Sequence, residues 1–228
     1  MNSIRYVIFD FDGVVADTEN MFALFDCHLI NQILPKVDKS PTLKPENLRS
    51  LAGHKGEEKL LKVGQILDVN LSPYVDEFLK LRNERRQNLF NDYPVKLGQN
   101  IDKLIERLDK RYAIATNKTS KKLAFDITAM GIESLFPRIV TCDPPLNRKP
   151  APDVILKAIE VLGAEPKECC YVGDNTIDMH AATSAGVAPV GFIIEGKEGH
   201  VDRINNLQKA GAQLIIDDFK ELEGYIKL

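Results

Sequence analysis

Two aspartates separated by a single residue end an apolar segment close to the start of the chain. Asp10 and Asp12 follow residues 7–9, whose sequence Val-Ile-Phe is typical of a buried strand. Aspartate is disfavoured inside strands, so the pair predicts that the strand ends there and that a polar site begins. Gly13 comes next, and glycine permits a sharp turn or a close approach of the backbone to an anion. We therefore expect a site with two carboxylates at the end of this strand.

Conspicuous polar residues follow three further segments of strand character. They are Thr116 and Asn117 after residues 112–115, Arg148 and Lys149 shortly after residues 138–141, and Asp174 and Asp178 after residues 169–172. In sheets of parallel strands, ligands bind beyond the carboxyl ends of the strands. We therefore expect the four loops to converge on one edge, where they bring carboxylates together with one ammonium group and one hydroxyl group.

Such a set of groups favours phosphoryl transfer. Carboxylates that lie close together raise one another's pKa unless a cation compensates their charge. Mg²⁺ takes oxygen ligands and keeps room for water and a substrate phosphate, and Lys149 would add further positive charge. The transition state of phosphoryl transfer needs this kind of cationic stabilisation. A carboxylate can also act as the nucleophile and form an aspartyl phosphate.

From about residue 100 the sequence alternates between strand and helix patterns. Asp153 is expected to cap the helix that begins there, and Gly131 and Gly163 are each expected to end the helix that precedes them. Alternation of this kind predicts an α/β fold with a doubly wound, mostly parallel sheet. Helices are predicted at 101–108, 120–130, 153–162 and 176–185, and strands at 112–115, 138–141, 169–172, 189–193 and 213–216.

Residues 18–89 have a different pattern, without a convincing strand. Apolar residues recur at helical spacing in 21–34, 57–67 and 75–89, and prolines mark the breaks between these segments. The sequence therefore predicts two domains. The core comprises residues 1–17 and 90–228, and a small helical domain, residues 18–89, is inserted directly after the first polar loop.

Composition excludes several classes of function. The 228 residues are 44% hydrophobic and 28% charged with a formal net charge of −3, which does not favour a nucleic-acid-binding protein. No apolar stretch approaches the roughly 20 residues that span a membrane, and the first strand begins too early to leave room for a signal peptide. Neither the four cysteines nor the four histidines have metal-ligand spacing, and Cys169 and Cys170 lie in a predicted buried strand. We expect a cytoplasmic protein with reduced cysteines.

The motifs and their order resemble those of the haloacid dehalogenase-like hydrolase superfamily. The matching segments are residues 10–18, 115–118, 149–153 and 171–179, and the resemblance covers essentially the whole chain. It is closest to phosphoglycolate phosphatase-like enzymes, in the branch that carries a helical cap after the first motif. The resemblance implies a Rossmann-like core, and identifies residues 18–89 with the cap.

The resemblance implies distinct roles for the aspartates. Asp10 would attack phosphorus and ligate Mg²⁺. Asp12 would protonate the leaving alcohol and then activate water, while its backbone carbonyl ligates the metal. Asp174 would be a metal ligand, and Asp178 would support the metal directly or through other ligands. An aspartate in the first turn of a helix also favours the helix dipole, so a purely structural role for Asp178 remains open.

Other residues would bind the phosphoryl group and the rest of the substrate. Thr116, the Asn117 loop and a backbone N–H near Gly13 would hold the phosphoryl oxygens, although Thr116 has an alternative role as a helix N-cap. Lys149 would bridge the nucleophile and the phosphoryl oxygens. The candidates for substrate contacts from the cap are Arg49, His54 and Lys55.

The resemblance favours a Mg²⁺-dependent phosphatase of a small phosphorylated metabolite. Asp12 distinguishes the chain from dehalogenases and phosphonatases, which lack an aspartate there. A β-phosphoglucomutase-type reaction is an alternative, but Ala52 stands where mutases carry a lysine, and Gly173 stands where they tend to carry glutamate. A catalytically silent binding protein is a further alternative. The substrate and the choice between monomer and homodimer stay open, with phosphoglycolate, hexose phosphates, nucleotides and pyrophosphate as candidate substrates.

Overall fold

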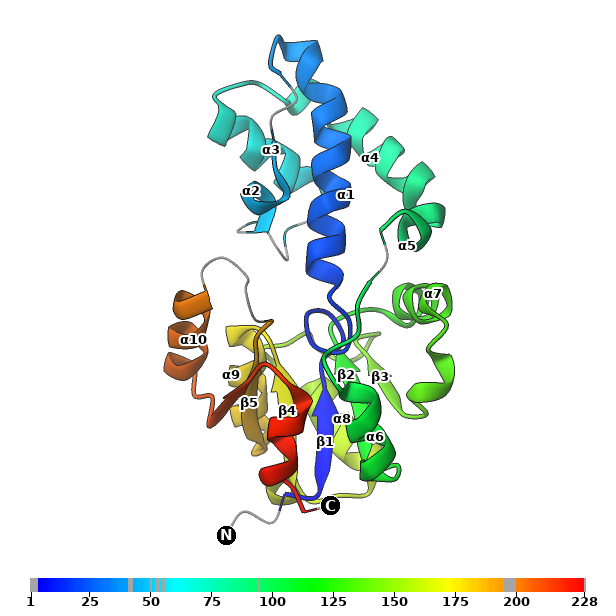
Figure 1. Ribbon diagram of the computed structural model, residues 1–228, viewed down its shortest axis with the longest axis vertical. Coiled ribbons are helices and arrows are strands. Elements are labelled where there is room, and N and C mark those ends of the chain that lie inside the picture. Colours follow the sequence, from blue (N-terminus) through cyan, green and yellow to red (C-terminus); the bar gives the residue numbers. More distant parts are fainter. Residues whose placement is uncertain are drawn as a thin grey trace. The chain divides into compact units, whose positions relative to one another are not determined.

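The computed structural model describes residues 4–40, 43–49, 51, 54, 56–93, 95–194 and 200–227, without the side chains of Arg49, Gln87 and His200. The chain folds into two compact units (Figure 1). The core unit comprises residues 1–17 and 96–228, and the helical unit comprises residues 18–95. The second boundary thus lies at 95/96, whereas the sequence pattern placed it at 89/90.

The core unit is built on six parallel strands in the order β3-β2-β1-β4-β5-β6. The prediction of a doubly wound parallel sheet is therefore confirmed. The central strands are short apolar runs in which every residue is buried or nearly so, as expected for a sheet covered on both faces. The strands are β1 (Tyr6–Phe9), β2 (Tyr112–Thr116), β3 (Ile139–Thr141), β4 (Cys169–Gly173), β5 (Ala188–Phe192) and β6 (Leu214–Ile216).

Alternate residues of the strands build the two halves of the core. Ile8 and Tyr171 face the helices that pack on β2 to β5, whereas Phe9 contacts Phe219 edge to face on the other side of the sheet. Phe219 also stacks on Phe192 and begins the 3₁₀ helix Phe219–Gly224. The helices of the core unit are α6 (Ile101–Leu108), α7 (Ser120–Met130), α8 (Asp153–Leu162), α9 (Thr176–Ala185) and α10 (His200–Lys209).

Two details of the core differ from the sequence prediction. Asp153 is the first residue of α8 but does not cap it, because its Oδ1 accepts hydrogen bonds from both the backbone and side-chain N–H groups of Asn147. Helix α10 was not predicted, since it is short and its apolar positions recur too few times to establish a period. Gly131 and Gly163 end α7 and α8 in the left-handed conformation, as expected.

The helical unit contains α1 to α5 and is held together around a buried charge. Asp26 of α1 is fully buried and contacts Lys59 of α3 at 2.9 Å and Arg82 of α4 at 2.7 Å. Two cations therefore compensate the desolvation of one carboxylate and link three helices. The helices are α1 (Thr18–Ile33), α2 (Pro45–Arg49), α3 (Gly56–Leu67), α4 (Val75–Arg85) and α5 (Leu89–Asp92), with 3₁₀ turns at Leu34–Val37, Ser72–Tyr74 and Arg86–Asn88.

Residues 90–95 belong to the helical unit because aromatic side chains anchor them there. Phe90 is buried, and Tyr93 packs edge to face against Phe25 of α1. The sequence prediction assigned this segment to the core, since a local pattern gives no sign of the distant partner on α1.

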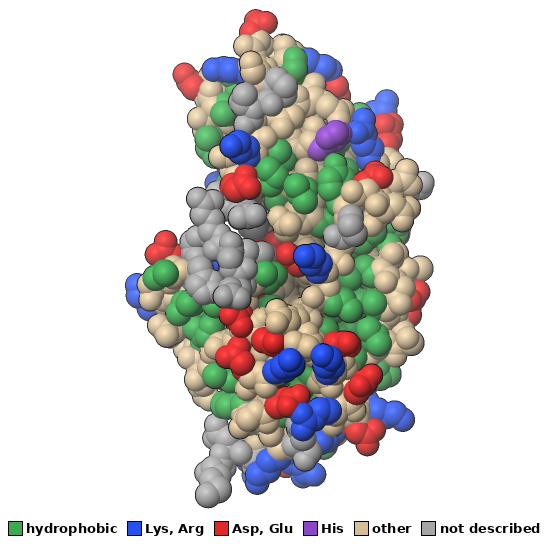
Figure 2. Space-filling view, in the orientation of Figure 1, with side chains coloured by type: hydrophobic (Ala, Val, Ile, Leu, Met, Phe, Trp, Pro, Cys, Tyr) green, Lys and Arg blue, Asp and Glu red, His purple; other side chains and the backbone are tan. Residues whose placement is uncertain are grey.

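The surface and the cysteines agree with the composition. All four cysteines are free and buried, as expected for small apolar side chains. Among the described residues of the core unit, the face in Figure 2 shows basic side chains interspersed with acidic ones. No helix in the described part of the chain is both long enough and apolar enough to cross a membrane.

Candidate active site

The polar loops predicted from the sequence meet at the carboxyl edge of the sheet. Asp10 directly follows β1, Thr116 ends β2, and Asp174 directly follows β4. Lys149 comes from the loop after β3, and Asp178 lies in the first turn of α9. The structure therefore brings these five residues together, as the parallel arrangement of the strands implies.

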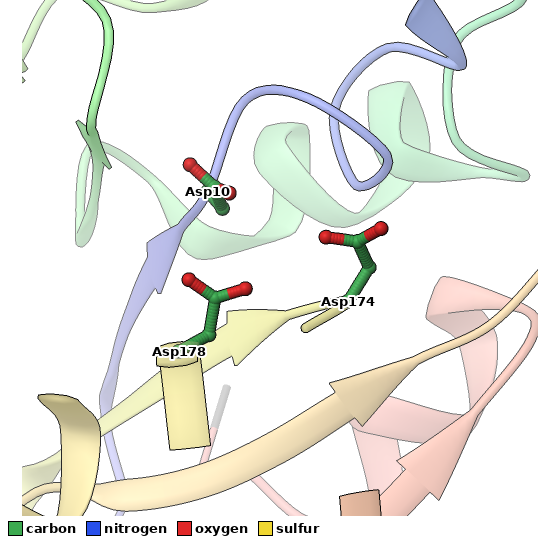
Figure 3. A group of neighbouring side chains, drawn as sticks. All are labelled: Asp10, Asp174 and Asp178. Atoms are coloured by element: carbon green, nitrogen blue, oxygen red, sulfur yellow. The ribbon is translucent and has the colours of Figure 1, made fainter. Parts of the chain in front are cut away.

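Three of these residues form an acidic cluster. Asp10, Asp174 and Asp178 each offer one carboxylate oxygen, and these atoms all lie within 4.8 Å of one another. Figure 3 shows that the three carboxylates, from the ends of β1 and β4 and the start of α9, face a common space. Burial raises the pKa of Asp10 to about 6, because the nearby carboxylates of Asp178 and Asp12 add to the desolvation and Lys149 offsets it only in part.

Two glycines allow the carboxylates to approach the backbone so closely. Gly13 has φ +77°, and a Cβ atom there would lie 2.3 Å from Oδ2 of Asp174. A Cβ atom on Gly173 would lie 2.3 Å from Cβ of Asp178. The N–H of Gly13 itself donates to the carbonyl of Ala16 at 2.8 Å, so the visible contribution of Gly13 is steric. Its predicted part in phosphate binding stays a prediction.

The acidic cluster fits a hard divalent cation. Its ligands are carboxylate oxygens, which Mg²⁺ prefers. Oδ1 of Asp10 and Oδ1 of Asp178 are buried and accept no hydrogen bond of good geometry, although each lies within 2.9 Å of the Lys149 ammonium. Asp178 also has the structural role that its position suggested, because its Oδ2 accepts the N–H of Asn175 and so helps cap α9.

Lys149 lies at the centre of the charged groups and is almost completely buried. Its Nζ lies 2.9 Å from Asp10 and 2.8 Å from Asp178, and donates to the hydroxyl of Tyr171 at 2.6 Å. Burial alone would lower the pKa of Lys149, but the carboxylates of Asp10 and Asp178 outweigh it and hold the pKa well above the ordinary value. An ammonium group has three protons, and three oxygens already lie within 2.9 Å of this one, so a direct bond from Lys149 to a phosphoryl oxygen stays a prediction.

Tyr171 is a site residue that the sequence analysis missed. It lies in the middle of β4, is fully buried, and donates its hydroxyl hydrogen to the carbonyl of Ala115 at 2.8 Å. The sequence offered one signal for this role. A tyrosine in a predicted buried strand needs a hydrogen-bond partner for its hydroxyl group. Burial raises its pKa well above the ordinary value, so the hydroxyl stays protonated and serves Lys149 as an acceptor.

We expect Tyr171→Phe to lower both stability and turnover. The substitution removes the oxygen that accepts from Lys149 and leaves the carbonyl of Ala115 without this donor, so the free energy of unfolding should fall by about 1–3 kcal/mol. Urea denaturation and initial rates measure the two effects. Tyr112→Phe is the matched control, because the Tyr112 hydroxyl donates to the carbonyl of Leu135 away from Lys149. Equal turnover in the two variants would contradict a role for Tyr171 in the site.

Thr116 and Asn117 have defined partners at the end of β2. The Thr116 hydroxyl accepts the N–H of Lys118 at 3.3 Å, and α7 begins only at Ser120, so Thr116 is not the N-cap of that helix. Oδ1 of Asn117 accepts the N–H of Lys149 at 2.7 Å, and its Nδ2 donates to the Lys149 carbonyl at 3.2 Å. The Asn117 side chain therefore positions the Lys149 loop, and phosphate contacts of Thr116 and Asn117 stay predictions.

Two further cations contact the site and were not assigned roles from the sequence. Lys118 lies 2.5 Å from Oδ1 of Asp12, and Arg203 of α10 lies 3.0 Å from Oδ2 of Asp174. Burial alone would lower the pKa of Lys118, but the carboxylates of Asp12 and Asp126 raise it overall. The position of Lys118 directly after the predicted Thr-Asn loop could have indicated a role in the site. No sequence feature indicated such a role for Arg203, because it lies 29 residues from Asp174.

Of the predicted substrate contacts from the helical unit, the structure describes the side chain of His54. Lys55 and the side chain of Arg49 lie outside the described residues, as do Ala52 and Gly53. His54 is described and is partly buried, with its Nδ1 3.3 Å from the carbonyl of Leu51. The roles proposed for these residues stay predictions.

Comparisons with known proteins identify a family for this chain. Residues 7–192 match the family model described as haloacid dehalogenase-like hydrolase. The chain is 24% identical over 196 residues to pyrophosphatase PpaX from Bacillus cereus strain B4264, an alignment that covers 85% of this chain and 86% of the relative.

Solved structures have the same fold. A haloacid dehalogenase-like protein of unknown function from Agrobacterium tumefaciens strain C58 is 25% identical, with a TM-score of 0.73 and coverage of 98% and 97% of the two chains. A predicted phosphoglycolate phosphatase from Haemophilus somnus is 21% identical, with a TM-score of 0.72 and coverage of 99% of both chains. Because the family match spans most of the sequence and the six-stranded core agrees with it, this chain belongs to the haloacid dehalogenase-like hydrolases.

Proposed function

We propose that the protein is a Mg²⁺-dependent phosphatase that hydrolyses a small phosphorylated metabolite through an aspartyl phosphate on Asp10. The observation that carries the proposal is the environment of Asp10. Its carboxylate lies beside the Lys149 ammonium and within the acidic cluster that fits a divalent cation. Membership of a hydrolase family and the similarity to proteins named pyrophosphatase support the same reaction class.

The reaction takes place in two steps. In the first, a carboxylate oxygen of Asp10 forms a bond to phosphorus, the bond to the leaving oxygen breaks, and that oxygen takes both the bonding electrons and a proton from Asp12. In the second, the Asp12 carboxylate takes a proton from water while the water oxygen attacks phosphorus. The bond between phosphorus and Asp10 then breaks, which releases inorganic phosphate and restores the Asp10 carboxylate.

The surrounding residues support these steps through charge and position. Mg²⁺ bound at Asp10 and Asp174 would neutralise negative charge on the phosphoryl oxygens. Lys149 holds the Asp10 carboxylate at 2.9 Å and contributes its positive charge. Asp178 also contacts the Lys149 ammonium, at 2.8 Å, and Asn117 fixes the Lys149 backbone.

We infer that the helical unit acts as a cap that selects the substrate, with Arg49, His54 and Lys55 as the candidate contacts. Phosphoglycolate, hexose phosphates and nucleotides are candidate substrates, and the relatives named pyrophosphatase support pyrophosphate as a further one. The cap would close over the site and exclude water, as lids of this kind do.

Phosphate release from a panel of phosphorylated compounds tests the proposal. We expect the protein with Mg²⁺ to release phosphate from p-nitrophenyl phosphate and from at least one panel member, and we expect EDTA to abolish the activity. Ranking kcat/KM over phosphoglycolate, pyrophosphate, nucleotides and hexose phosphates identifies the substrate class. Interconversion of hexose 1- and 6-phosphates without net phosphate release would replace the phosphatase with a mutase. Lack of turnover with every compound and metal would contradict both.

A further inference from the structure

Lys118 contacts charged or aromatic groups on three sides. Its Nζ lies 2.5 Å from Oδ1 of Asp12, 2.6 Å from Oδ2 of Asp126, and 4.8 Å from the centre of the Phe11 ring. Phe11 is fully buried, and the Lys118 side chain is only 11% exposed. The ammonium group is therefore held in place and is not a solvated surface charge.

Asp126 is the second carboxylate that contacts the Lys118 ammonium. It lies on α7, beside the buried Ile127, and its side chain is completely buried. A buried carboxylate is costly unless a cation compensates it, and Lys118 is that cation. Because removing Lys118 from Asp126 would leave a buried charge, the ion pair keeps the ammonium next to Asp12.

The backbone of Lys118 is fixed as well. Its N–H donates to the Thr116 hydroxyl at 3.3 Å, and its carbonyl accepts the N–H of Cys142 at 2.9 Å. These contacts connect the residue to the ends of β2 and β3, which are parts of the rigid sheet. Both ends of the Lys118 side chain are therefore tied to structured elements.

The two aspartates of the first motif have matching arrangements. Asp10 contacts Lys149, which also contacts the buried Asp178. Asp12 contacts Lys118, which also contacts the buried Asp126. In both cases a lysine fixed by a second carboxylate reaches an aspartate at the strand end, but only Asp12 is substantially exposed, at 36% of its side chain.

We propose that Lys118, fixed by Asp126, is a positioning residue that holds the Asp12 carboxyl group where it exchanges a proton with the leaving oxygen and with water. This inference rests on the function proposed for Asp12. Removing the lysine takes away the 2.5 Å contact that restrains the partly exposed Asp12 side chain, and proton transfer should slow because it depends on the distance between donor and acceptor.

Leaving groups of different basicity separate this role from a purely structural one. Phenyl phosphate and p-nitrophenyl phosphate have nearly the same shape, but phenolate leaves less readily and depends more on a proton from Asp12. Values of kcat/KM report the steps up to transfer of the phosphoryl group to Asp10. We expect Lys118→Met to raise the ratio of kcat/KM for p-nitrophenyl phosphate over phenyl phosphate by about tenfold, in the same direction as Asp12→Asn. Asp126→Asn should produce a smaller rise.

Two variants serve as controls for the measurement. Lys118→Arg should restore much of the wild-type ratio, because a guanidinium group can contact both carboxylates. Lys121→Met removes an exposed lysine of α7 and should leave the ratio unchanged. Thermal unfolding of every variant shows which are folded, and Lys118→Arg and Asp126→Asn keep the test open if Lys118→Met does not fold.

The outcomes distinguish the inference from the function on which it rests. If Asp12→Asn changes the ratio while Lys118→Met lowers kcat/KM equally for both esters, Lys118 serves only to neutralise Asp126 and the inference is overturned. If Asp12→Asn leaves the ratio unchanged, the proton-transfer role of Asp12 fails and the inference fails with it. A selective loss in both variants, reversed by Lys118→Arg, supports the inference.

Discussion

Asp10→Asn should lower kcat by at least about 10³-fold without lowering the stability of the metal-free protein. The substitution removes the nucleophile but keeps the shape of the side chain. Lys149 retains Asp178 and Tyr171 as partners, so its burial remains compensated. Initial rates of phosphate release measure the first effect, and chemical denaturation in EDTA measures the second. Substantial remaining turnover would contradict the covalent mechanism.

The same variant has a defined pH dependence. Burial raises the pKa of Asp10 in the folded protein to about 6 from the ordinary value of 3.8, so ionising Asp10 disfavours the folded state. The wild-type protein should therefore lose stability relative to Asp10→Asn as pH rises from about 4 to about 6. The difference should be near zero at low pH and level off at about 3 kcal/mol above pH 6. Unfolding curves collected in EDTA at several pH values give this difference.

Asp143→Asn is the matched control for the pH experiment. Asp143 is partly exposed, and hydrogen bonds from the Thr141 hydroxyl and the Ser120 N–H lower its pKa below the ordinary value. Its charged form is therefore favoured in the folded state, and the sign of any pH effect is reversed. In Mg²⁺, stabilisation of the wild-type protein should exceed that of Asp10→Asn, because the variant replaces a charged carboxylate ligand of the proposed metal with a neutral amide.

Gly13→Ala should lower turnover by about 10²-fold or more and remove most of the stabilisation by Mg²⁺. Its Cβ would lie 2.3 Å from Oδ2 and 2.6 Å from Cγ of Asp174, so that carboxylate must move out of the acidic cluster. The positive φ of +77° adds backbone strain of about 1–2 kcal/mol. Rates at saturating Mg²⁺ and thermal unfolding with and without Mg²⁺ measure the two effects.

Gly163→Ala separates steric displacement of Asp174 from backbone strain. Gly163 also has a positive φ, at +62°, but no atom lies within 4 Å of the position of its Cβ. This variant should therefore lose a similar amount of stability from strain while keeping full activity and full stabilisation by Mg²⁺. If Gly13→Ala retains activity equal to that of Gly163→Ala, close packing of Gly13 against Asp174 is not required by the site.

The sequence was most informative where local pattern and sheet topology act together. Short apolar runs ending in Asp10 or Asp174 predict strands that stop at polar loops, and strand–helix alternation makes the strands parallel. Parallel strands place all their carboxyl ends on one edge. The meeting of Asp10, Lys149, Asp174 and Asp178, and the place of Thr116 at the same edge of the sheet, therefore followed from the order of the motifs. Membership of the hydrolase family followed from the motifs themselves.

The predictions failed where the partner of a residue lies outside its own helix or strand. Residues 90–95 join the helical unit because Tyr93 packs on Phe25, which lies on a helix far earlier in the chain. Asp153 satisfies the amides of Asn147 instead of capping its own helix, because the folded loop places those donors closer. Neither interaction leaves a periodic signal in the sequence.

The sequence by itself determined the fold class, the family and the edge of the sheet at which the polar groups gather, because these depend on the periodicity and order of short segments. Only the tertiary structure decided which charges pair there. Lys149 joins Asp10 to Asp178, and Lys118 joins Asp12 to Asp126. Such pairing depends on distances of a few ångströms between side chains of different elements, and packing fixes those distances in three dimensions.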